Sequence, residues 1–535
     1  MASLPRHLAR YAGRGLWSDT TNGRRAYGWA EAEPDTVVFL GDPARPTYAS
    51  LLTDAEALAR ALIDLGLTPG DVVSFQVPNW SEAAVINLAA CLGGFVVAPI
   101  VPIYRDAEVT QMLADSMARV FFVAERFRTV DFAAMVTRIR PQLPALDHVI
   151  YVRPAAEHDS LAALVDHGRR LTHALPTVDP DAIKLLLYTS GTTGRPKAVL
   201  HSHNTLDRVA QFGFRHSGLG AGEVTLMPSP VTHISGFAAG LEKPFAAGSR
   251  TVLMETWNAV EAVELIDRFQ VSSTVAATPF LHELCDAAAA SGRTLPSFRR
   301  FACGGAAVPA DLVRSANARL AHPCAFRVYG SSEVPLATQG CLPEDDPELA
   351  ATTDGKPLDY DLQIVDDAGT AVAAGHDGEI LARGPAMFLG YLDPAQTAEA
   401  ITDDGFFRTG DIGHLTADGA LVITGRKKDL IIRGGENISA KEIEDVLTAH
   451  AAIREAAVVA MPHPRLGEGV CAFLVPAGAA RPDLPAIAAI VAAAGLARQK
   501  CPERIAYVTD LPRTASGKVR KDVLRTDARR LVDDG

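Results

Sequence analysis

Short apolar runs alternate with amphipathic segments through the N-terminal two-thirds of the chain. The runs are rich in Val, Ile, Phe and Leu, and the segments between them have helical spacing. Alternation of this kind predicts parallel sheets covered by helices. The strand candidates are residues 37–40, 71–77, 120–123, 148–152, 183–188, 251–253 and 326–329.

Two helices are predicted near the start of this pattern. Residues 51–65 place Leu58, Leu62 and Leu65 on one face, as an amphipathic helix does. Asn79 and Glu82 have the spacing of a capping box, so a second helix is expected to begin at Asn79.

The longest apolar stretch, residues 84–104, is broken by Gly93, Gly94 and two prolines. A membrane-spanning helix needs about 20 unbroken apolar residues. The stretch is therefore predicted to be a buried helix followed by a buried strand, and no transmembrane segment is expected.

The pattern changes near Gly355. From there to Thr424, strand-like pieces and Gly/Asp turns predict a β-rich subdomain, and after Arg426 the chain has the pattern of a short α+β unit. We therefore expect an α/β fold with a large N-terminal domain, residues 1–427, made of stacked α/β subdomains plus the β-rich subdomain. A small α+β C-terminal domain, residues 428–535, is expected to follow.

Charge and cysteine content exclude several classes of function. The 535 residues carry a net charge of −12, whereas nucleic-acid binding needs a basic footprint, so no nucleic-acid partner is expected. The seven cysteines contain no C-x-x-C pair, which argues against a zinc site and favours a reducing, cytoplasmic setting. Residues 1–15 lack the apolar core of a signal peptide.

The strongest chemical signal is the segment Tyr188-Thr189-Ser190-Gly191-Thr192-Thr193-Gly194-Arg195-Pro196-Lys197, which follows an apolar strand. Glycines let a backbone approach an anion closely, while amides and hydroxyls donate to phosphate oxygens. The spacing differs from that of a Walker loop, which needs G-x-x-x-x-G-K-[ST]. The segment therefore predicts a phosphate-binding loop of another kind.

This loop resembles the signature of the adenylate-forming superfamily: acyl-CoA synthetases, firefly luciferase and the adenylation domains of peptide synthetases. The resemblance covers almost the whole chain, and its character is closest to medium-chain and cyclohexanecarboxylate CoA ligases. Ala198 stands where the family usually has Gly, and Ser332 where it most often has Thr, so the hydroxyl is kept. The other matching motifs occupy residues 303–307, 329–333, 409–411, 425–429, 434–439 and 512–518.

The resemblance implies a site for ATP and Mg²⁺. In it, Tyr329 stacks on adenine, Ser332 donates to the α-phosphate, Glu333 binds Mg²⁺, and the Asp411 carboxylate accepts from the ribose hydroxyls. The other expected nucleotide-binding residues are Thr189, Ser190, Gly191, Thr192, Thr193, Gly194, Lys197, Gly304, Gly305, Ala306, Gly330, Ile423 and Arg426.

The resemblance also implies a mobile C-terminal domain that serves two half-reactions. Lys518 is expected to act in adenylation and Lys428 to lie at the hinge. Gly434 and Gly435 are expected to border the pantetheine tunnel of coenzyme A.

His233 matches the gate beside the acyl site. Ile234 stands where amino-acid-activating relatives carry Asp, so an α-amino acid substrate is not expected. The pocket segments carry small and apolar residues and no obvious counter-charge, which fits a medium-chain, alicyclic, aromatic or polycyclic acid. These segments are residues 233–240, 278–280, 302–304 and 334–336.

The predicted reaction is therefore ATP-dependent activation of a carboxylic acid to acyl-AMP, then transfer to coenzyme A, as in fatty acid metabolism. A homodimer is a candidate assembly. Three alternatives remain: a ligase that loads a separate carrier protein, a luciferase-like oxidative enzyme, and a non-catalytic ATP-binding protein.

Overall fold

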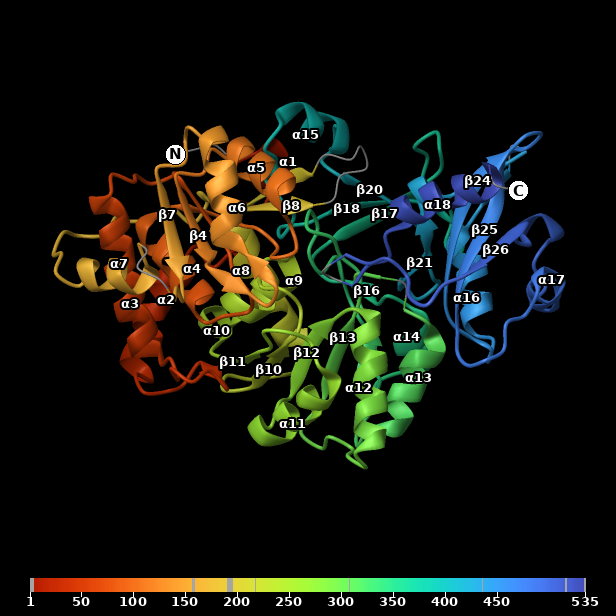
Figure 1. Cartoon of the computed structure of the whole chain (residues 1–535), viewed down its shortest axis with the longest axis horizontal. Coiled ribbons are helices and arrows are strands. Elements are labelled where there is room, and N and C mark those ends of the chain that lie inside the picture. The colour runs from red at the N-terminus through yellow and green to blue at the C-terminus, as the bar shows by residue number, and fades with distance from the viewer. Residues whose placement is uncertain are drawn as a thin grey trace.

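The computed structural model describes residues 4–155, 159–189, 196–216, 218–306, 308–434, 436–514 and 517–533. Stacked α/β layers and a β-rich layer form a large N-terminal domain, and a small α+β domain follows, as the sequence predicts. In Figure 1 the blue C-terminal domain lies at one end of the molecule and the red-to-yellow N-terminal segment at the other.

The first sheet has the strand order β19-β9-β8-β3-β2-β4-β7 in the described part of the chain. Strands β8, β3, β2, β4 and β7 are parallel, whereas β9 and β19 each run antiparallel to the neighbouring strand. The strands are β2 (Val72–Gln76), β3 (Val96–Pro99), β4 (Val120–Ala124), β7 (His148–Val152), β8 (Ile183–Thr189), β9 (Lys197–Ser202) and β19 (Gly390–Tyr391).

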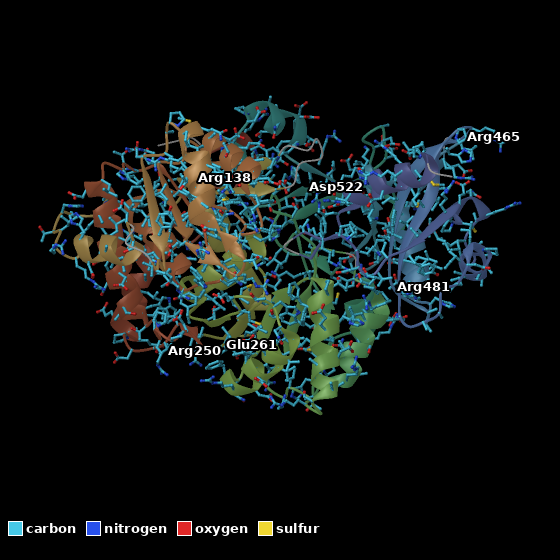
Figure 2. All side chains as sticks on the ribbon, in the orientation of Figure 1. Arg138, Arg250, Glu261, Arg465, Arg481 and Asp522 are labelled. Atoms are coloured by element: carbon cyan, nitrogen blue, oxygen red, sulfur yellow. The ribbon has the colours of Figure 1, made fainter. Side chains whose placement is uncertain are left out.

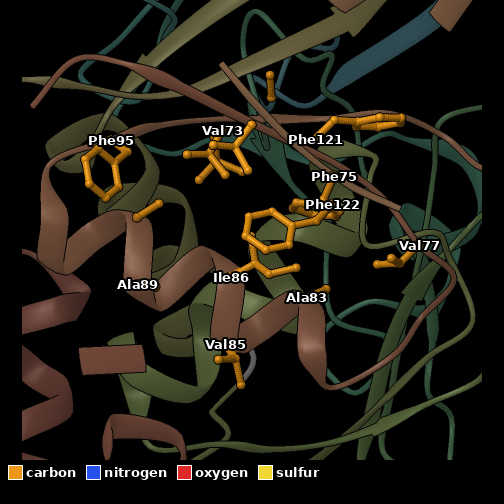
Figure 3. Close-up of a cluster of buried hydrophobic side chains, with 14 of the residues drawn as sticks. Val73, Phe75, Val77, Ala83, Val85, Ile86, Ala89, Phe95, Phe121 and Phe122 are labelled. Atoms are coloured by element: carbon orange, nitrogen blue, oxygen red, sulfur yellow. The ribbon is translucent and has the colours of Figure 1, made fainter. Parts of the chain in front are cut away.

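Helices cover this sheet and bury its apolar runs. Figure 3 shows Phe75 of β2 and Phe122 of β4 beside Ile86 of a buried helix. Strands buried on both faces are apolar throughout rather than alternating, which explains the continuous apolar runs in the sequence. The helices of this region are α1 (Arg6–Ala9), α2 (Asn22–Ala32), α3 (Tyr48–Asp64), α4 (Glu82–Gly93), α5 (Asp106–Asp115), α6 (Phe132–Ile139), η1 (Arg140–Gln142), α7 (Leu161–Gly168) and α8 (His203–His216), and a hairpin joins β5 (Arg126–Phe127) to β6 (Val130–Asp131).

The second sheet is parallel throughout and has the order β1-β11-β10-β12-β13-β14 in the described part. Its strands are β1 (Phe39–Leu40), β10 (Val224–Met227), β11 (Arg250–Leu253), β12 (Ser273–Ala276), β13 (Arg300–Cys303) and β14 (Ala325–Arg327). Its helices are α9 (Ile234–Gly236), the π-helical η2 (Phe237–Glu242), α10 (Lys243–Ala247), α11 (Ala259–Phe269), α12 (Thr278–Ala290), α13 (Ala310–Arg319) and α14 (Pro347–Thr352).

An antiparallel sheet, β17-β18-β20-β21, forms the predicted β-rich subdomain. Strand β19 lies inside the same sequence range but joins the first sheet, so this subdomain is tied to the α/β layers. The elements are β15 (Thr338–Gln339), β16 (Lys356–Pro357), β17 (Asp361–Val365), β18 (Gly378–Arg383), α15 (Pro394–Ala400), β20 (Phe407–Leu415) and β21 (Leu421–Arg426).

The C-terminal domain has apolar cores of its own, built from residues 431 to 531. A short connector, η3 (Lys427–Asp429), joins it to β21. The division between residues 427 and 428 stays a prediction, although the separate cores are consistent with it. The elements are β22 (Ile431–Arg433), β23 (Glu436–Ile438), α16 (Ala440–Thr448), β24 (Ile453–His463), β25 (Gly467–Pro476), α17 (Leu484–Ala493), η4 (Arg498–Lys500), β26 (Arg504–Tyr507) and α18 (Lys521–Asp533).

Most predicted elements are confirmed, but the capping role of Asn79 is wrong. Helix α4 begins at Glu82, and its cap residue makes no side-chain cap bond. The Asn79 amide instead donates to the Ser229 carbonyl at 2.9 Å, and its oxygen accepts from the Val231 amide at 2.8 Å. Asn79 therefore holds a loop between the two α/β layers.

Charged side chains cover the outside of the molecule, as Figure 2 shows for Arg465 and Arg481. Among the described residues, no helix is long and apolar enough to cross a membrane.

One ion pair is buried completely where α2, α4, β8 and η2 meet. The Lys184 ammonium pairs with the Glu242 carboxylate, and the two side chains are 1% and 2% exposed. Asn22 and Asn87 also donate to Glu242, at 2.8 and 2.6 Å. Removing one partner of such a pair leaves an uncompensated buried charge, which is strongly destabilising.

We expect Glu242→Ala to lower the free energy of unfolding by about 3–5 kcal/mol, because it leaves Lys184 charged and buried. Thermal and urea unfolding would measure the loss. The matched control is Asp361→Ala, which breaks an exposed Arg–Asp pair with Arg383 and should cost about 1 kcal/mol or less. Similar losses in both variants would contradict the importance of the buried pair.

Candidate active site

The C-terminal domain faces the carboxyl ends of the N-terminal strands across a cleft of about 3480 Å³. Ligands in open α/β sheets bind in this kind of crevice. Residues of both domains line the cleft. The predicted site residues that line it are Thr189, His233, Gly304, Gly305, Ala306, Tyr329, Gly330, Ser332, Glu333, Asp411, Ile423, Arg426, Lys428 and Lys518.

The remaining predicted residues fall elsewhere. Most of the phosphate loop, Ser190, Gly191, Thr192, Thr193 and Gly194, lies outside the described residues, as does Gly435. Lys197 and Gly434 are described but do not line the cleft.

Glu333 is held by Tyr391, a residue that the sequence did not single out. The Tyr391 hydroxyl donates to Glu333 Oε1 at 2.9 Å. The Lys197 ammonium lies 4.9 Å from the centre of the Tyr391 ring, a cation–π distance. Lys197 is therefore linked to the cleft through a single side chain, although it does not line the cleft itself.

Ser332 is positioned by a buried histidine of β9. His201 Nε2 lies 2.7 Å from the Ser332 carbonyl oxygen. Burial lowers the pKa of His201 to about 4, so the ring is neutral at pH 7 and Nε2 donates to the carbonyl. The Ser332–Glu333 turn is thus attached to the first sheet.

Asp411 joins an aromatic ring and a guanidinium at the rim of the β-rich sheet. The Tyr329 hydroxyl donates to Asp411 Oδ2 at 2.7 Å, and Arg426 Nε pairs with Oδ1. Burial, followed by the Asp411 charge, raises the pKa of Tyr329 well above its usual value, so the phenol stays protonated. Asp411 is itself only 5% exposed.

A second buried ion pair, which the sequence did not reveal, supports this network. Arg327 Nη2 lies 2.6 Å from Asp354 Oδ2, and both side chains are buried. Asp354 Oδ2 also accepts from the Ile423 amide at 2.9 Å. The pair therefore fixes the end of β14, just before Tyr329, relative to β21.

Lys518 enters the cleft from the C-terminal domain. A Cβ at Gly305 would lie 3.8 Å from Lys518 Cε, and a Cβ at Gly517 would lie 3.5 Å from Ala277 Cβ. Gly517 has φ +84°, which suits glycine. Burial, and then the charge of Arg426, lower the pKa of Lys518, while Asp411 and Glu333 act in the opposite direction.

The connector between the domains is held from the C-terminal side. Arg525 of α18 donates to the Lys428 carbonyl at 3.2 Å and pairs with Asp429. Burial, and then Arg426, lower the pKa of Lys428.

His233 is the N-cap residue of α9 and lines the same cleft. Burial lowers its pKa to about 4, and the charge of Lys518 adds to this effect. Its Nδ1 lies 3.3 Å from the Ser235 hydroxyl. At pH 7 the ring is therefore neutral.

The lining of the cleft includes one buried lysine that lies outside the predicted pocket segments. Most of the predicted pocket residues line the cleft, but so does Lys243, which is 9% exposed. The predicted segments themselves carry no lysine, arginine or carboxylate, and Lys243 lies three residues beyond the end of the first of them. The signal was available, because Glu242 and Lys243 are two charges inside an apolar segment.

The residues of the cleft fit ATP and Mg²⁺. A Cβ at Gly305 would point into the cleft, so the backbone there can lie against a flat ring. The described residues contain no group of three or more His, Cys, Asp or Glu that could hold a metal alone. A single carboxylate, Glu333, suits Mg²⁺, which binds through one or two carboxylates together with substrate phosphates.

Residues 27–392 match the family described as AMP-binding enzyme, and residues 442–518 match the AMP-binding enzyme C-terminal domain. The chain therefore belongs to the AMP-binding enzyme family, the adenylate-forming superfamily that its motifs resemble, and it is an enzyme of the ligase class.

The similar proteins include enzymes named as CoA ligases and enzymes named as AMP ligases. The chain is 35% identical to the medium-chain fatty-acid–CoA ligase of Escherichia coli (strain K12), over 98% of this chain and 94% of that protein. It is 31% identical to 2,3-dihydroxybenzoate-AMP ligase of Bacillus subtilis (strain 168), over 97% and 96%. ATP-bound MatB from Rhodopseudomonas palustris has a TM-score of 0.84 to it at 26% identity, over 96% of this chain and 100% of that one.

We expect the ring of His233 to titrate near pH 4, well below the usual value of about 6.5. Lys518→Met should raise this midpoint without restoring 6.5, because burial is the larger cause. Imidazole NMR would follow the titration, with the resonance assigned by its loss in His233→Asn. The control variant Arg481→Ala, at an exposed site, should leave the His233 midpoint unchanged. If Lys518→Met also leaves it unchanged, Lys518 does not lie close to His233.

Proposed function

We propose that this enzyme uses ATP to convert a carboxylic acid to acyl-AMP and then transfers the acyl group to coenzyme A. The observation that carries the proposal is the arrangement around Lys518. This side chain comes from the C-terminal domain and lies beside Gly305. The charge of Arg426 lowers its pKa, whereas the charges of Asp411 and Glu333 raise it.

The chemistry explains why such an arrangement is needed. A carboxylate and a nucleotide phosphate are both anionic, so a site that joins them must offset their repulsion and stabilise an in-line transition state. Lys518 and Arg426 supply positive charge within the cleft. Mg²⁺, which Glu333 would hold, supplies further charge neutralisation at the phosphate oxygens.

The other residues bind and orient the nucleotide in this proposal. Tyr329 presents its ring to adenine, Asp411 accepts from the ribose hydroxyls, and the Ser332 hydroxyl donates to the α-phosphate. The network around Asp411 supports these roles, because Tyr329 and Arg426 both bond to its carboxylate. Tyr329, Asp411 and Arg426 are therefore oriented before a ligand enters.

The second half-reaction requires a rotation of the C-terminal domain about Lys428. Lys518 lies inside the cleft while Gly434 lies outside it, which fits the adenylating arrangement. Rotation would withdraw Lys518 and bring the Gly434 loop towards the acyl group, beside the path for the pantetheine thiol.

The acceptor is coenzyme A in this proposal, supported by the similarity to the medium-chain fatty-acid–CoA ligase. A carrier protein is the second candidate, because the chain is nearly as similar to a 2,3-dihydroxybenzoate-AMP ligase.

We also propose a cytoplasmic setting, since all seven cysteines, each a described residue, are free thiols.

The half-reactions test the proposal. Lys518→Ala should lower acyl-AMP formation by at least about 10²–10³-fold, the usual effect of removing one well-aimed donor. The same variant should still form thioester from supplied acyl-AMP and coenzyme A. Lys428→Pro should still form acyl-AMP but should lose thioester formation, because proline stiffens the connector about which the domain rotates. Pyrophosphate release and thioester formation, measured separately, would report the two steps.

Arg481→Ala, which removes an exposed cation of the C-terminal domain outside the cleft, is the control and should leave both steps unchanged. If Lys518→Ala and Lys428→Pro lose both half-reactions equally, domain alternation does not operate in this chain. If wild type forms acyl-AMP but transfers it only to a carrier protein, the second candidate replaces coenzyme A.

A further inference from the structure

A cluster of polar groups lies deep in the cleft, away from the reacting groups. Lys243, at the start of α10, donates to the Thr225 hydroxyl at 3.0 Å. The Thr225 hydroxyl lies 3.1 Å from that of Ser273 on the neighbouring strand. All three residues line the cleft and are at most 9% exposed.

The strand register gives the distance of this cluster from the chemistry. Ser273 and Ala277 are four residues apart along the line of β12, and each residue advances about 3.3 Å, so they are separated by about 13 Å. Ala277 lies against Gly517, next to Lys518. The strand position beside the Lys243 cluster and the one beside Lys518 are therefore separated by about the length of a medium-chain or fused-ring acid.

Small apolar side chains form part of the wall between the two ends, together with Thr274. Side chains alternate along a strand, so Ser273 and Val275 share one face of β12. Val275 is paired with Ala302 of β13, and both line the cleft. Ala238 and Ala239 of η2 line it as well. We call this stretch of the cleft, which has small apolar residues in its wall and a cationic, hydroxyl-bearing end, the apolar channel.

An ammonium at the end of an apolar channel selects among ligands. An ammonium carries a full charge and three N–H donors, and its charge acts on a ligand whatever hydrogen bonds the lysine makes to protein. A purely hydrocarbon end group would remove solvent from that charge and return no hydrogen bond, which is unfavourable. An oxygen acceptor at the same place is stabilised.

Burial lowers the pKa of Lys243 to about 8, with the charge of Glu223 acting in the opposite direction. At pH 7 the protonated form thus outnumbers the neutral form by about tenfold. The group remains a cation under ordinary conditions.

We propose that Lys243, together with Thr225 and Ser273, recognises an oxygen acceptor at the far end of the acid. The acceptor is a keto or hydroxyl oxygen or a second carboxylate. This inference rests on the proposed adenylation and narrows its substrate from apolar acids to acids that carry oxygen at both ends.

The test compares saturated medium-chain acids of several lengths with their ω-hydroxy, ω-oxo and ω-carboxy counterparts, in wild type and Lys243→Met. Wild type should have a higher kcat/KM for at least one oxygenated class than for the plain acid of equal length. Lys243→Met should lower that value by about 10- to 100-fold, as expected for the loss of a hydrogen bond to a charged group. The loss should appear as a higher KM with kcat unchanged, because the contact is remote from the reacting atoms.

The plain acid serves as the folding control, since Lys243→Met should activate it at least as well as wild type does. Lys356→Met, on exposed strand β16 outside the cleft, is the matched lysine control and should change neither class. The class of acid whose kcat/KM falls in Lys243→Met identifies the acceptor. A fall for the ω-carboxy acids alone indicates a second carboxylate, and a fall for the ω-hydroxy or ω-oxo acids indicates a neutral oxygen.

An unchanged preference in Lys243→Met, or a wild-type preference for the plain acid at every length, would overturn this inference and leave the proposed function intact. Failure of wild type to release AMP with any acid would overturn both.

Discussion

The buried ion pair between Arg327 and Asp354 is the contact on which the site depends. It connects β14 of the second sheet to β21 of the β-rich sheet, and the Asp354 carbonyl also accepts from the Thr338 hydroxyl. Breaking such a pair on one side is costly, because the remaining charge has no compensation. The positions of Tyr329, which follows β14, and of Ile423, on β21, are thereby fixed relative to each other.

Positive charge is concentrated near the strands that this pair joins, β14 and β21. Arg426 pairs with Asp411, while Lys518 and Lys428 approach the same cleft with lowered pKa values. Burial is the first cause for both lysines, and Arg426 is the second. An anionic ligand placed among them would offset this repulsion. The hydrogen-bond partners of Glu333 and Asp411 orient the two carboxylates beforehand, which reduces the cost of reorganisation during the reaction.

The sequence predicted those parts of the site that depend on short segments. Gly304, Gly305, Tyr329, Glu333 and Lys518 lie in local motifs, and the structure brings them into one cleft. Parallel sheets were predictable from continuous apolar runs.

Features that depend on contacts between distant segments were not predictable. Asn79 has the spacing of a helix cap, yet it bonds to a loop some 150 residues away. Arg327 and Asp354 meet only once two sheets have packed. Local spacing carries no information about such pairings.

The most direct measurement follows a heavy-oxygen label from the carboxylate of an activated acid. After a complete reaction with ATP and coenzyme A, we expect AMP as the nucleotide product, and we expect it to carry one labelled oxygen because the carboxylate attacks the α-phosphorus. ADP as the product, with the label in inorganic phosphate, would contradict this expectation.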